Sequence, residues 1–336
     1  MKMKKLSIVL ASLVAMLIVT SAQARDQIKI VGSSTVFPYA TIVAERFGAG
    51  GKFKTPVIES TGTGGGAKLF CAGVGAEHPD ITNASRAMKS KEYAECQKNG
   101  VNEIAEINIG NDGITLAFSK DAKPVNFTKA QLYKALVKEV VVNGQKVANP
   151  YKKWSDIDPA LPNYDIKVMV PPSTSGTRDA WGSLVMEKAI SKEEKEAKID
   201  PLEFRTDGPV IEVGENDALI VQKLSQDKEL FGFFGFSYFL DAKDKLQAAS
   251  IEGKQPSLKG IQDYSYPIAR PLFFYVKLAH VQVIPGLHDF IKEFTSTKSM
   301  GAKGYLASKG LVPSDAKTYK TSRDNAVKLV NMPEKK

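Results

Sequence analysis

A glycine-rich turn at residues 60–68 constrains the fold of this chain more than any other stretch. It reads Ser-Thr-Gly-Thr-Gly-Gly-Gly-Ala-Lys and stands between a strand-like run at 55–59 and a segment that can open a helix. Because glycine has no Cβ, the backbone N–H groups of such a turn can approach an oxyanion closely. The N-terminal partial charge of the following helix would add to that attraction. The stretch therefore predicts a strand, an anion-binding turn and a helix.

Three further turns have similar chemistry, at 32–38, 83–86 and 173–178. One glycine-rich turn alone is more often a plain connector. Four turns rich in hydroxyl groups, at least three of them opening helices, favour a single buried anion held by neutral donors. Nucleoside triphosphate binding is excluded because no Lys-Ser/Thr pair ends the glycine run. A dinucleotide-binding fingerprint is also missing.

The N-terminal segment 1–24 has the features of a secretory signal. Three lysines (Lys2, Lys4 and Lys5) precede an apolar run at 6–20, and small residues follow at 21–24. The apolar run is too short to favour a membrane-spanning helix. We therefore expect cleavage before residue 25 or 26 and a soluble mature protein outside the cytoplasm.

Charge and cysteine content narrow the function classes. Without the three signal lysines the net charge falls from +9 to +6, and the lysines are scattered rather than clustered with aromatic residues. Nucleic-acid binding is therefore not expected. In an oxidising compartment Cys71 and Cys96 should form a disulfide, which contributes roughly 3 kcal/mol by the chain-entropy model. The three histidines share no ligand spacing, so no metal site is expected.

Strand-like and helix-like segments alternate along the chain, which predicts an α/β fold. The mature length exceeds one comfortable hydrophobic core and suggests two lobes. No internal repeat or flexible linker divides the chain. The expected strands lie at 27–31, 79–83, 104–109, 113–118, 166–170, 230–240 and 272–276, and the clearest expected helices begin at 38, 127 and 288.

Five segments together resemble one known family. They are residues 32–36, 61–66, 80–86, 175–178 and 266–271. In this order they are similar to the periplasmic phosphate-binding proteins of ABC importers. The resemblance implies a type II periplasmic binding protein fold with two crossover strands. One lobe would hold 26–112 plus 272–336 and the other 113–271. It also implies a monomer without cofactor or catalytic activity that binds inorganic phosphate and delivers it to a membrane permease and ATPase.

The resemblance also implies a set of phosphate-binding residues. The first turn would supply two hydroxyls and an N–H, the glycine turn a hydroxyl and an N–H, and the third turn a Ser-Gly-Thr run. Hydroxyl and amide dipoles suit a buried oxyanion. The residues are Ser34, Thr35 and Val36, then Thr63 and Gly64, then Ser85, and then Ser175, Gly176 and Thr177.

Two departures from the family pattern affect the charged groups. Better-known members have an aspartate where this chain has Arg86, and an arginine where it has Pro171. Arg86 and Arg178 are expected to supply the guanidinium groups. Asp112 is the expected replacement for the aspartate, which would accept the proton of hydrogen phosphate and reject sulfate. A turn role for Asp112 fits its sequence equally well.

Three alternatives to phosphate transport stay open. Another tetrahedral oxyanion, such as sulfate, would suit the same turns. A secreted phosphoryl hydrolase would need metal ligands or an activated nucleophile, and the isolated histidines suggest neither. An adhesion or matrix-binding role would make anion binding incidental.

Overall fold

A computed structural model describes residues 25–173, 175–214 and 217–335. The predicted signal segment at 1–24 lies outside the described residues. Within the described part of the chain, none of the helices has the length and apolar character needed to span a membrane.

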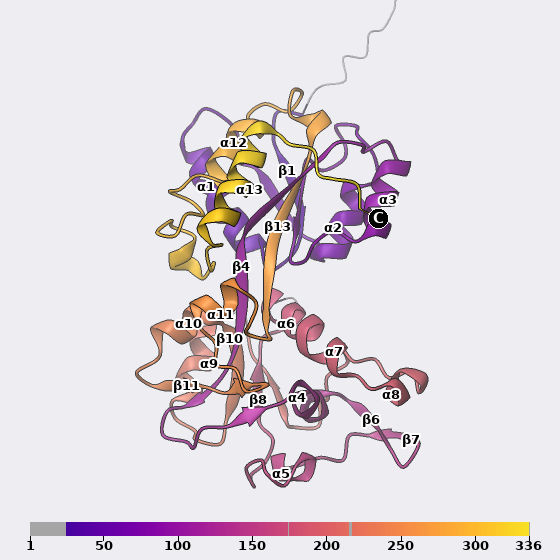
Figure 1. Cartoon of the computed structure of the whole chain (residues 1–336), viewed down its shortest axis with the longest axis vertical. Helices are drawn as coiled ribbons and strands as arrows, with labels where there is room; N and C mark the ends of the chain where they lie inside the picture. The colour runs from indigo at the N-terminus through magenta and orange to yellow at the C-terminus, as the bar shows by residue number, and fades with distance from the viewer. Residues whose placement is uncertain (1–24, 174, 215–216, 336) are drawn as a thin grey trace, which may run out of the picture.

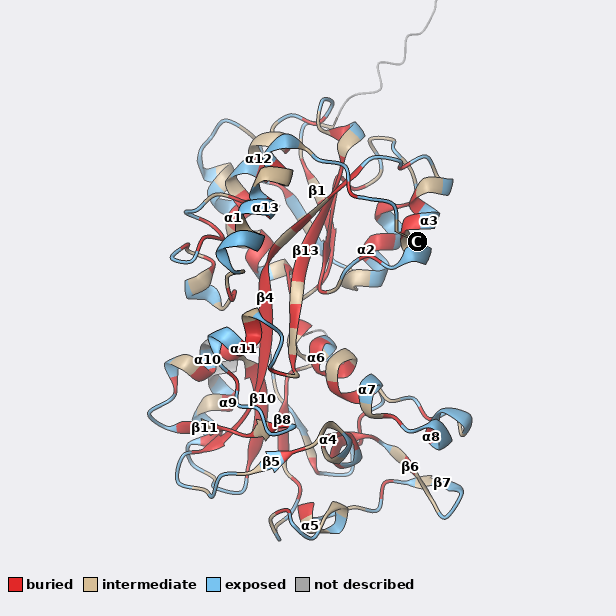
Figure 2. Cartoon of the chain, viewed as in Figure 1, coloured by how far each residue is buried: buried red, intermediate tan, exposed pale blue. Residues whose placement is uncertain are grey.

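Two long antiparallel strands, β4 (Ile104–Ser119) and β13 (Ala269–Lys277), run between the two lobes that are visible in Figure 1. Both are buried along most of their length, as Figure 2 shows. The sequence predicts two strands around 110–112, but the structure contains one. Gly110 takes a φ of 143° there, and backbone hydrogen bonds join Asn111 to Val312, so the chain bends without turning back.

Lobe 1 contains the elements from β1 to α3 and from η2 to α13. Its strands follow the order β2-β1-β3-β13-β4, with β1 parallel to both neighbours. Its two apolar clusters draw residues from 28–109 and 272–332. The strands are β1 (Lys29–Gly32), β2 (Val57–Ser60) and β3 (Ile81–Ala84), and the helices are α1 (Phe37–Ala49), α2 (Gly62–Phe70), α3 (Ser90–Lys98), η2 (Leu278–His280), α12 (Leu287–Phe294), η3 (Ala307–Lys309) and α13 (Ala316–Lys328).

The glycine run is helical rather than a turn, because α2 begins at Gly62. Glycine has a low helix propensity, and tertiary packing overrides it here. A Cβ on Gly66 would lie 2.4 Å from the Cα of Gly32, so the helix can approach β1 only without a side chain at this position. The run therefore brings the start of α2 against the end of the first strand.

Lobe 2 contains the elements from β5 to α11. Its strands β10, β8 and β9 continue the sheet from β4, with β10 antiparallel to β4 and parallel to β8. The strands are β5 (Asn126–Phe127), β6 (Glu139–Val142), β7 (Gln145–Ala148), β8 (Val168–Val170), β9 (Val210–Glu212), β10 (Phe231–Gly235), β11 (Leu246–Ala248) and β12 (Ser250–Ile251). The helices are α4 (Lys129–Leu136), α5 (Trp154–Ile157), α6 (Gly176–Trp181), the π-helix η1 (Gly182–Met186), α7 (Glu187–Ala189), α8 (Lys192–Glu196), α9 (Asp217–Leu224), α10 (Phe236–Asp241) and α11 (Leu258–Gln262).

The core of lobe 2 is rich in aromatic side chains. Trp181 stacks on Phe233 with ring centroids 4.1 Å apart, and Phe231 contacts Trp154 edge to face. This core draws on residues 114–268 together with Val312. The aromatic run at 230–240 splits into β10 and α10, and most of its rings are buried. The lobe boundaries at 112/113 and 271/272 stay a prediction.

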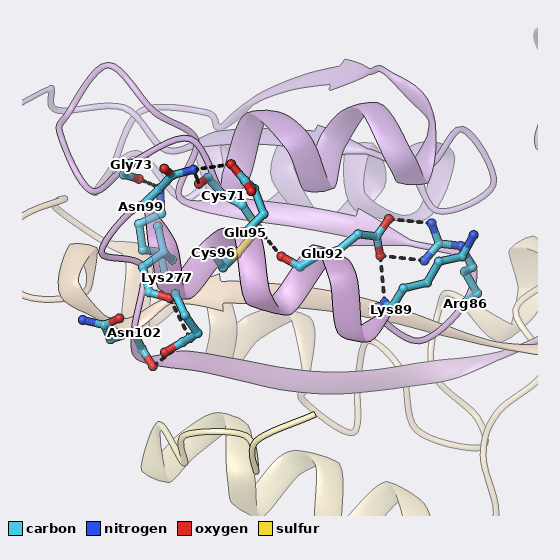
Figure 3. The surroundings of a disulfide bond; sticks show 12 residues. Cys71, Gly73, Arg86, Lys89, Glu92, Glu95, Cys96, Asn99, Asn102 and Lys277 are labelled. Carbon is cyan, nitrogen blue, oxygen red and sulfur yellow. Dashed lines mark hydrogen bonds and ion pairs between the residues drawn. A yellow bond between two sulfur atoms is a disulfide. The ribbon is translucent and has the colours of Figure 1, made fainter. Parts of the chain in front are cut away.

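Cys71 and Cys96 form a disulfide, as the sequence predicts. The bond joins the end of α2 to the last turn of α3, as Figure 3 shows. Asn99 donates its side-chain amide to the carbonyl of Cys71 at 2.9 Å. The disulfide thus fixes α3 against the helix that starts with the glycine run.

Candidate functional site

A cleft of about 510 Å³ opens between the two lobes. Lobe 1 lines it with the turn before α1 and a loop near residue 310, and lobe 2 with the turn before α6 and the start of α10. The lining residues are Ser34, Thr35, Phe37, Pro38, Tyr39, Ser60, Asp112, Ser175, Gly176, Thr177, Gly235, Tyr238, Lys309 and Gly310.

The turn after β1 contributes Ser34 and Thr35 to the cleft. Val36, by contrast, is fully buried, and its N–H donates to Ser33 Oγ at 3.4 Å. The thirteen-residue helix α1 starts directly behind this turn. The dipole of that helix favours a negative charge at that end. The structure thus brings two of the three predicted residues of this turn into the cleft.

The turn before α6 faces the first turn across the cleft. Ser175 accepts a hydrogen bond from the Thr177 N–H at 3.2 Å and thereby caps α6. Thr35 Oγ1 lies 3.1 Å from the carbonyl oxygen of Gly176. A Cβ on Gly176 would lie 2.3 Å from the Cα and N of Thr35. The lobes approach this closely only because residue 176 is glycine.

Gly176→Ala should therefore block closure of the cleft. The added methyl group collides with backbone rather than with a movable side chain, so the lobes must stay apart. We expect ligand affinity to fall at least ~10-fold, because contacts from the opposite lobe are lost, while the melting temperature stays near wild type. Calorimetric titration and thermal melts test this. Gly214→Ala is the matched control, because a Cβ there meets nothing within 4 Å. Equal affinities in the two variants would contradict the prediction.

The cleft lining does not include the predicted residues Thr63, Gly64 and Ser85. Thr63 Oγ1 is 3.0 Å from Ser85 Oγ and accepts the Ser85 N–H at 3.1 Å. Gly64 is exposed at the start of α2. The two hydroxyls therefore satisfy each other in this conformation, and their role in ligand binding stays a prediction.

The structure places neither Arg86 nor Arg178 in the cleft. Arg86 makes a two-pronged ion pair with Glu92 of α3, with N–O distances of 2.7 and 2.8 Å (Figure 3). Arg178 stacks over the Phe204 ring at 3.7 Å and donates to the Pro171 carbonyl at 2.9 Å. Both guanidinium groups already have partners, so their assignment as ligand groups stays a prediction that this conformation does not favour.

Arg270 on β13 is the charged residue that the sequence reasoning missed. Its side chain is almost fully buried between the lobes. Nη2 donates to Thr35 Oγ1 at 2.7 Å and to the Gly176 carbonyl at 3.1 Å. It thus contacts the same two turns that line the cleft. The signal that could have revealed it is its place in the segment 266–271, one of the five on which the family resemblance rests.

Asp112 lies directly opposite Arg270 in the register of β4 and β13. Its Oδ2 is 3.5 Å from Arg270 Nε and makes no hydrogen bond with the residues that the structure describes. Burial raises the pKa of this carboxyl, and Arg270 opposes that rise. Asp112 lines the cleft. A buried carboxylate oxygen without a donor is suited to accept the O–H of a protonated oxyanion.

Together these groups can hold a small anion without enclosing it in positive charge. Hydroxyls come from both lobes, one guanidinium stands behind them, and one carboxylate supplies an acceptor. Among residues 25–173, 175–214 and 217–335 no cluster of three or more His, Cys, Asp or Glu side chains could hold a metal ion.

Comparison with known proteins identifies the class. A family model described as "PBP superfamily domain" matches residues 19–298. Protein SphX of Synechococcus elongatus is 32% identical over 295 residues, which cover 86% of this chain and 77% of that protein. Phosphate-binding protein PstS of Staphylococcus haemolyticus is 31% identical over 302 residues, which cover 88% of this chain and 84% of that protein.

Solved structures of similar proteins lead to the same family. A possible phosphate-binding protein from Planctomyces limnophilus superposes with a TM-score of 0.72 at 27% identity and covers 91% of this chain and 99% of that one. An ABC-type phosphate transport receptor from Vibrio cholerae, 17% identical with a TM-score of 0.57, shares the fold over 80% of this chain and 94% of that one. The fold is therefore the type II periplasmic binding protein fold. Within the PBP superfamily, the chain belongs to the family of phosphate-binding proteins, which are substrate-binding proteins and not enzymes.

Proposed function

We propose that this protein captures inorganic phosphate in the interlobe cleft and delivers it to the permease and ATPase of an ABC importer. The observation that carries the proposal is the pair formed by Arg270 and Asp112 at the cleft. Arg270 attracts the anion, and the unbonded oxygen of Asp112 accepts a ligand proton. Ser34, Thr35, Ser175 and Thr177 add donors from both lobes.

The same pair favours phosphate over sulfate. Near neutral pH phosphate carries at least one O–H, whereas sulfate carries none. A sulfate oxygen against Asp112 would face a carboxylate with no hydrogen between them, which is repulsive in a site of low dielectric. Selectivity for phosphate over sulfate therefore depends on the ability of Asp112 to accept a hydrogen bond from the O–H of the ligand.

The names of similar proteins and the signal-like segment support a role of this binding in transport. Relatives carry the names phosphate-binding protein PstS and ABC-type phosphate transport receptor. With the signal-like segment at 1–24, this supports a periplasmic carrier that meets its permease at the membrane. Closure of the lobes over the ligand would give the permease a signal that the carrier is loaded.

Calorimetric titration of the ligand-stripped mature chain tests the proposal. We expect 1:1 binding of phosphate near neutral pH and no heat from sulfate. Asp112→Asn should weaken phosphate binding and allow sulfate to bind, because the amide can donate a hydrogen bond to a sulfate oxygen. Binding of sulfate alone to the wild type would leave the fold in place and overturn the ligand. Binding of neither anion would overturn the proposed function.

A further inference from the structure

A short strap at residues 310–314 lies across the crossover strand β4, next to the cleft. The Asn111 N–H donates to the Val312 carbonyl at 2.7 Å, and the Val312 N–H donates to the Asn111 carbonyl at 3.0 Å. Asn111 directly precedes Asp112, whose carboxylate lines the cleft. The backbone of the strap is therefore fixed beside the acidic group of the site.

The strap is also bound to both lobes through side chains. Val312 is 3% exposed and packs in the aromatic-rich core of lobe 2. Gln262 of α11, in the same lobe, donates its side-chain amide to the Pro313 carbonyl at 2.8 Å. Ser314 Oγ donates to Asn108 Oδ1 in the lobe 1 part of β4 at 2.6 Å. These contacts hold the residues that directly precede the strap in a defined place at the cleft.

Lys309 is the residue that the strap holds there. It ends the helix η3, and Gly310 follows it in a left-handed conformation with a φ of 103°. Both residues line the cleft. Lys309 is exposed, and its ammonium group makes no hydrogen bond or ion pair with the residues that the structure describes. Among the described residues of the cleft lining, Lys309 is the cation and Asp112 the anion.

The charges behind the cleft do not supply a net positive charge. Arg270 Nε lies 3.5 Å from Asp112, and its Nη1 lies 3.4 Å from Asp179 of α6. One guanidinium thus faces two carboxylates. Even with one of these carboxyls protonated, the group as a whole is neutral. Attraction of an anion into the cleft from solvent therefore requires a further cation, and Lys309 is placed to provide it.

We propose that Lys309 is a ligand-binding residue, whose ammonium group draws the anion into the cleft and forms an ion pair with it there. The identity of this anion rests on the proposed function, whereas the electrostatic attraction applies to any small oxyanion. A cleft with walls of low dielectric focuses the field of such a charge and raises the local concentration of the anion. Because the strap fixes the backbone of Lys309, little chain entropy is lost when the ammonium group meets the ligand.

Calorimetric titration of the mature protein with phosphate at two ionic strengths tests this role. We expect Lys309→Gln to weaken phosphate binding roughly 5-fold at ~0.01 M ionic strength, the upper range for an exposed ion pair. At ~1 M the Debye length falls to about 3 Å, so variant and wild type should bind nearly alike. Lys309→Arg keeps the charge and should stay close to wild type. Lys303→Gln removes an exposed lysine of the same segment that does not line the cleft, and should match wild type throughout.

Three results would overturn the role of Lys309 while the proposed function stands. They are equal phosphate affinities of wild type and Lys309→Gln at low ionic strength, a loss of the same size at both ionic strengths, and the same loss in Lys303→Gln. The last would indicate a general effect of net charge. Melting temperatures equal to that of wild type exclude misfolding of the variants.

Titration with sulfate separates this role from the proposed function. If wild type binds sulfate but not phosphate, the proposed ligand fails. A salt-dependent loss of sulfate affinity in Lys309→Gln would then still support the role of Lys309, and equal sulfate affinities would overturn it. Binding of neither anion to the wild type overturns both proposals.

Discussion

Arg270→Ala should lower phosphate affinity at least ~30-fold, which corresponds to about 2 kcal/mol or more for loss of one partner in a buried, hydrogen-bonded charge pair. The variant loses the guanidinium that contacts both cleft turns. It also leaves Asp112 buried without its cation. Because Arg270 lowers the pKa of that carboxyl, its removal lets burial raise the pKa further. Titration calorimetry measures the loss.

Arg270→Lys separates the contribution of the positive charge to phosphate affinity from that of the guanidinium geometry. Lysine keeps the positive charge but presents a single ammonium group, which cannot reach Thr35, Gly176 and Asp112 in the directions of the planar guanidinium. We therefore expect an affinity between those of wild type and Arg270→Ala. Arg323→Ala on the exposed face of α13 is the control for loss of one positive charge.

Arg178→Ala in the same series decides between two assignments of the ligand arginine. The sequence alone favours Arg178 together with Arg86, while the structure favours Arg270. A large loss of affinity in Arg178→Ala with little change in Arg270→Ala would contradict the structural assignment. The reverse pattern would contradict the sequence-based one.

The two arginines show where sequence reasoning reaches its limit. Arg178 follows Thr177 directly, so a motif places both in one turn. Successive residues on a helix point about 100° apart, however, and Arg178 turns toward Phe204 instead. Arg270 reaches the cleft through the register of β13 on β4, which sets it opposite Asp112. Register depends on long-range pairing that local patterns do not encode.

The turns were easier to predict because their chemistry is local. The Gly-Ser-Ser-Thr and Ser-Gly-Thr segments each follow a short buried strand and open a helix, and both line the cleft. The alternation of strands and helices likewise predicts the α/β class correctly. The continuous β4 and the helical glycine run could not be predicted in this way. Both depend on packing partners far along the chain, Val312 for the strand and Gly32 for the helix.

A second large effect is expected in lobe 1, at the fully buried Asp80. Its carboxylate accepts from Arg25 at 2.6 Å and from the backbone N–H of Lys29 at 2.7 Å, and lies 2.6 Å from His280 Nδ1. The other ring nitrogen of His280 is 2.7 Å from the Val74 carbonyl oxygen. Both nitrogens therefore face acceptors. Asp80 thus accepts from the Arg25 cation and from a backbone N–H directly before β3.

Asp80→Asn should lower the free energy of unfolding by about 3–5 kcal/mol, the usual cost of breaking a buried ion pair from one side. The amide cannot neutralise Arg25 and would turn an N–H group toward another donor. Urea denaturation measures the change, and Asp244→Asn on the exposed surface is the matched control. A loss below ~1 kcal/mol would mean that the carboxylate does not compensate the charge of Arg25.

The pH dependence of the stability lost in Asp80→Asn tests whether Asp80 also stabilises the charge of Lys277. Burial lowers the pKa of this lysine to about 8, and Asp80 opposes the shift. Without Asp80 the pKa falls further. The unfolded-state pKa of lysine is about 10.4. A lysine whose folded-state pKa is lower destabilises the fold while it is charged. This penalty disappears as the pH rises from the folded-state pKa to the unfolded-state pKa. The stability difference between wild type and Asp80→Asn should therefore shrink between pH 7 and pH 9. A difference that stays constant or grows over this range would show that Lys277 is not coupled to Asp80.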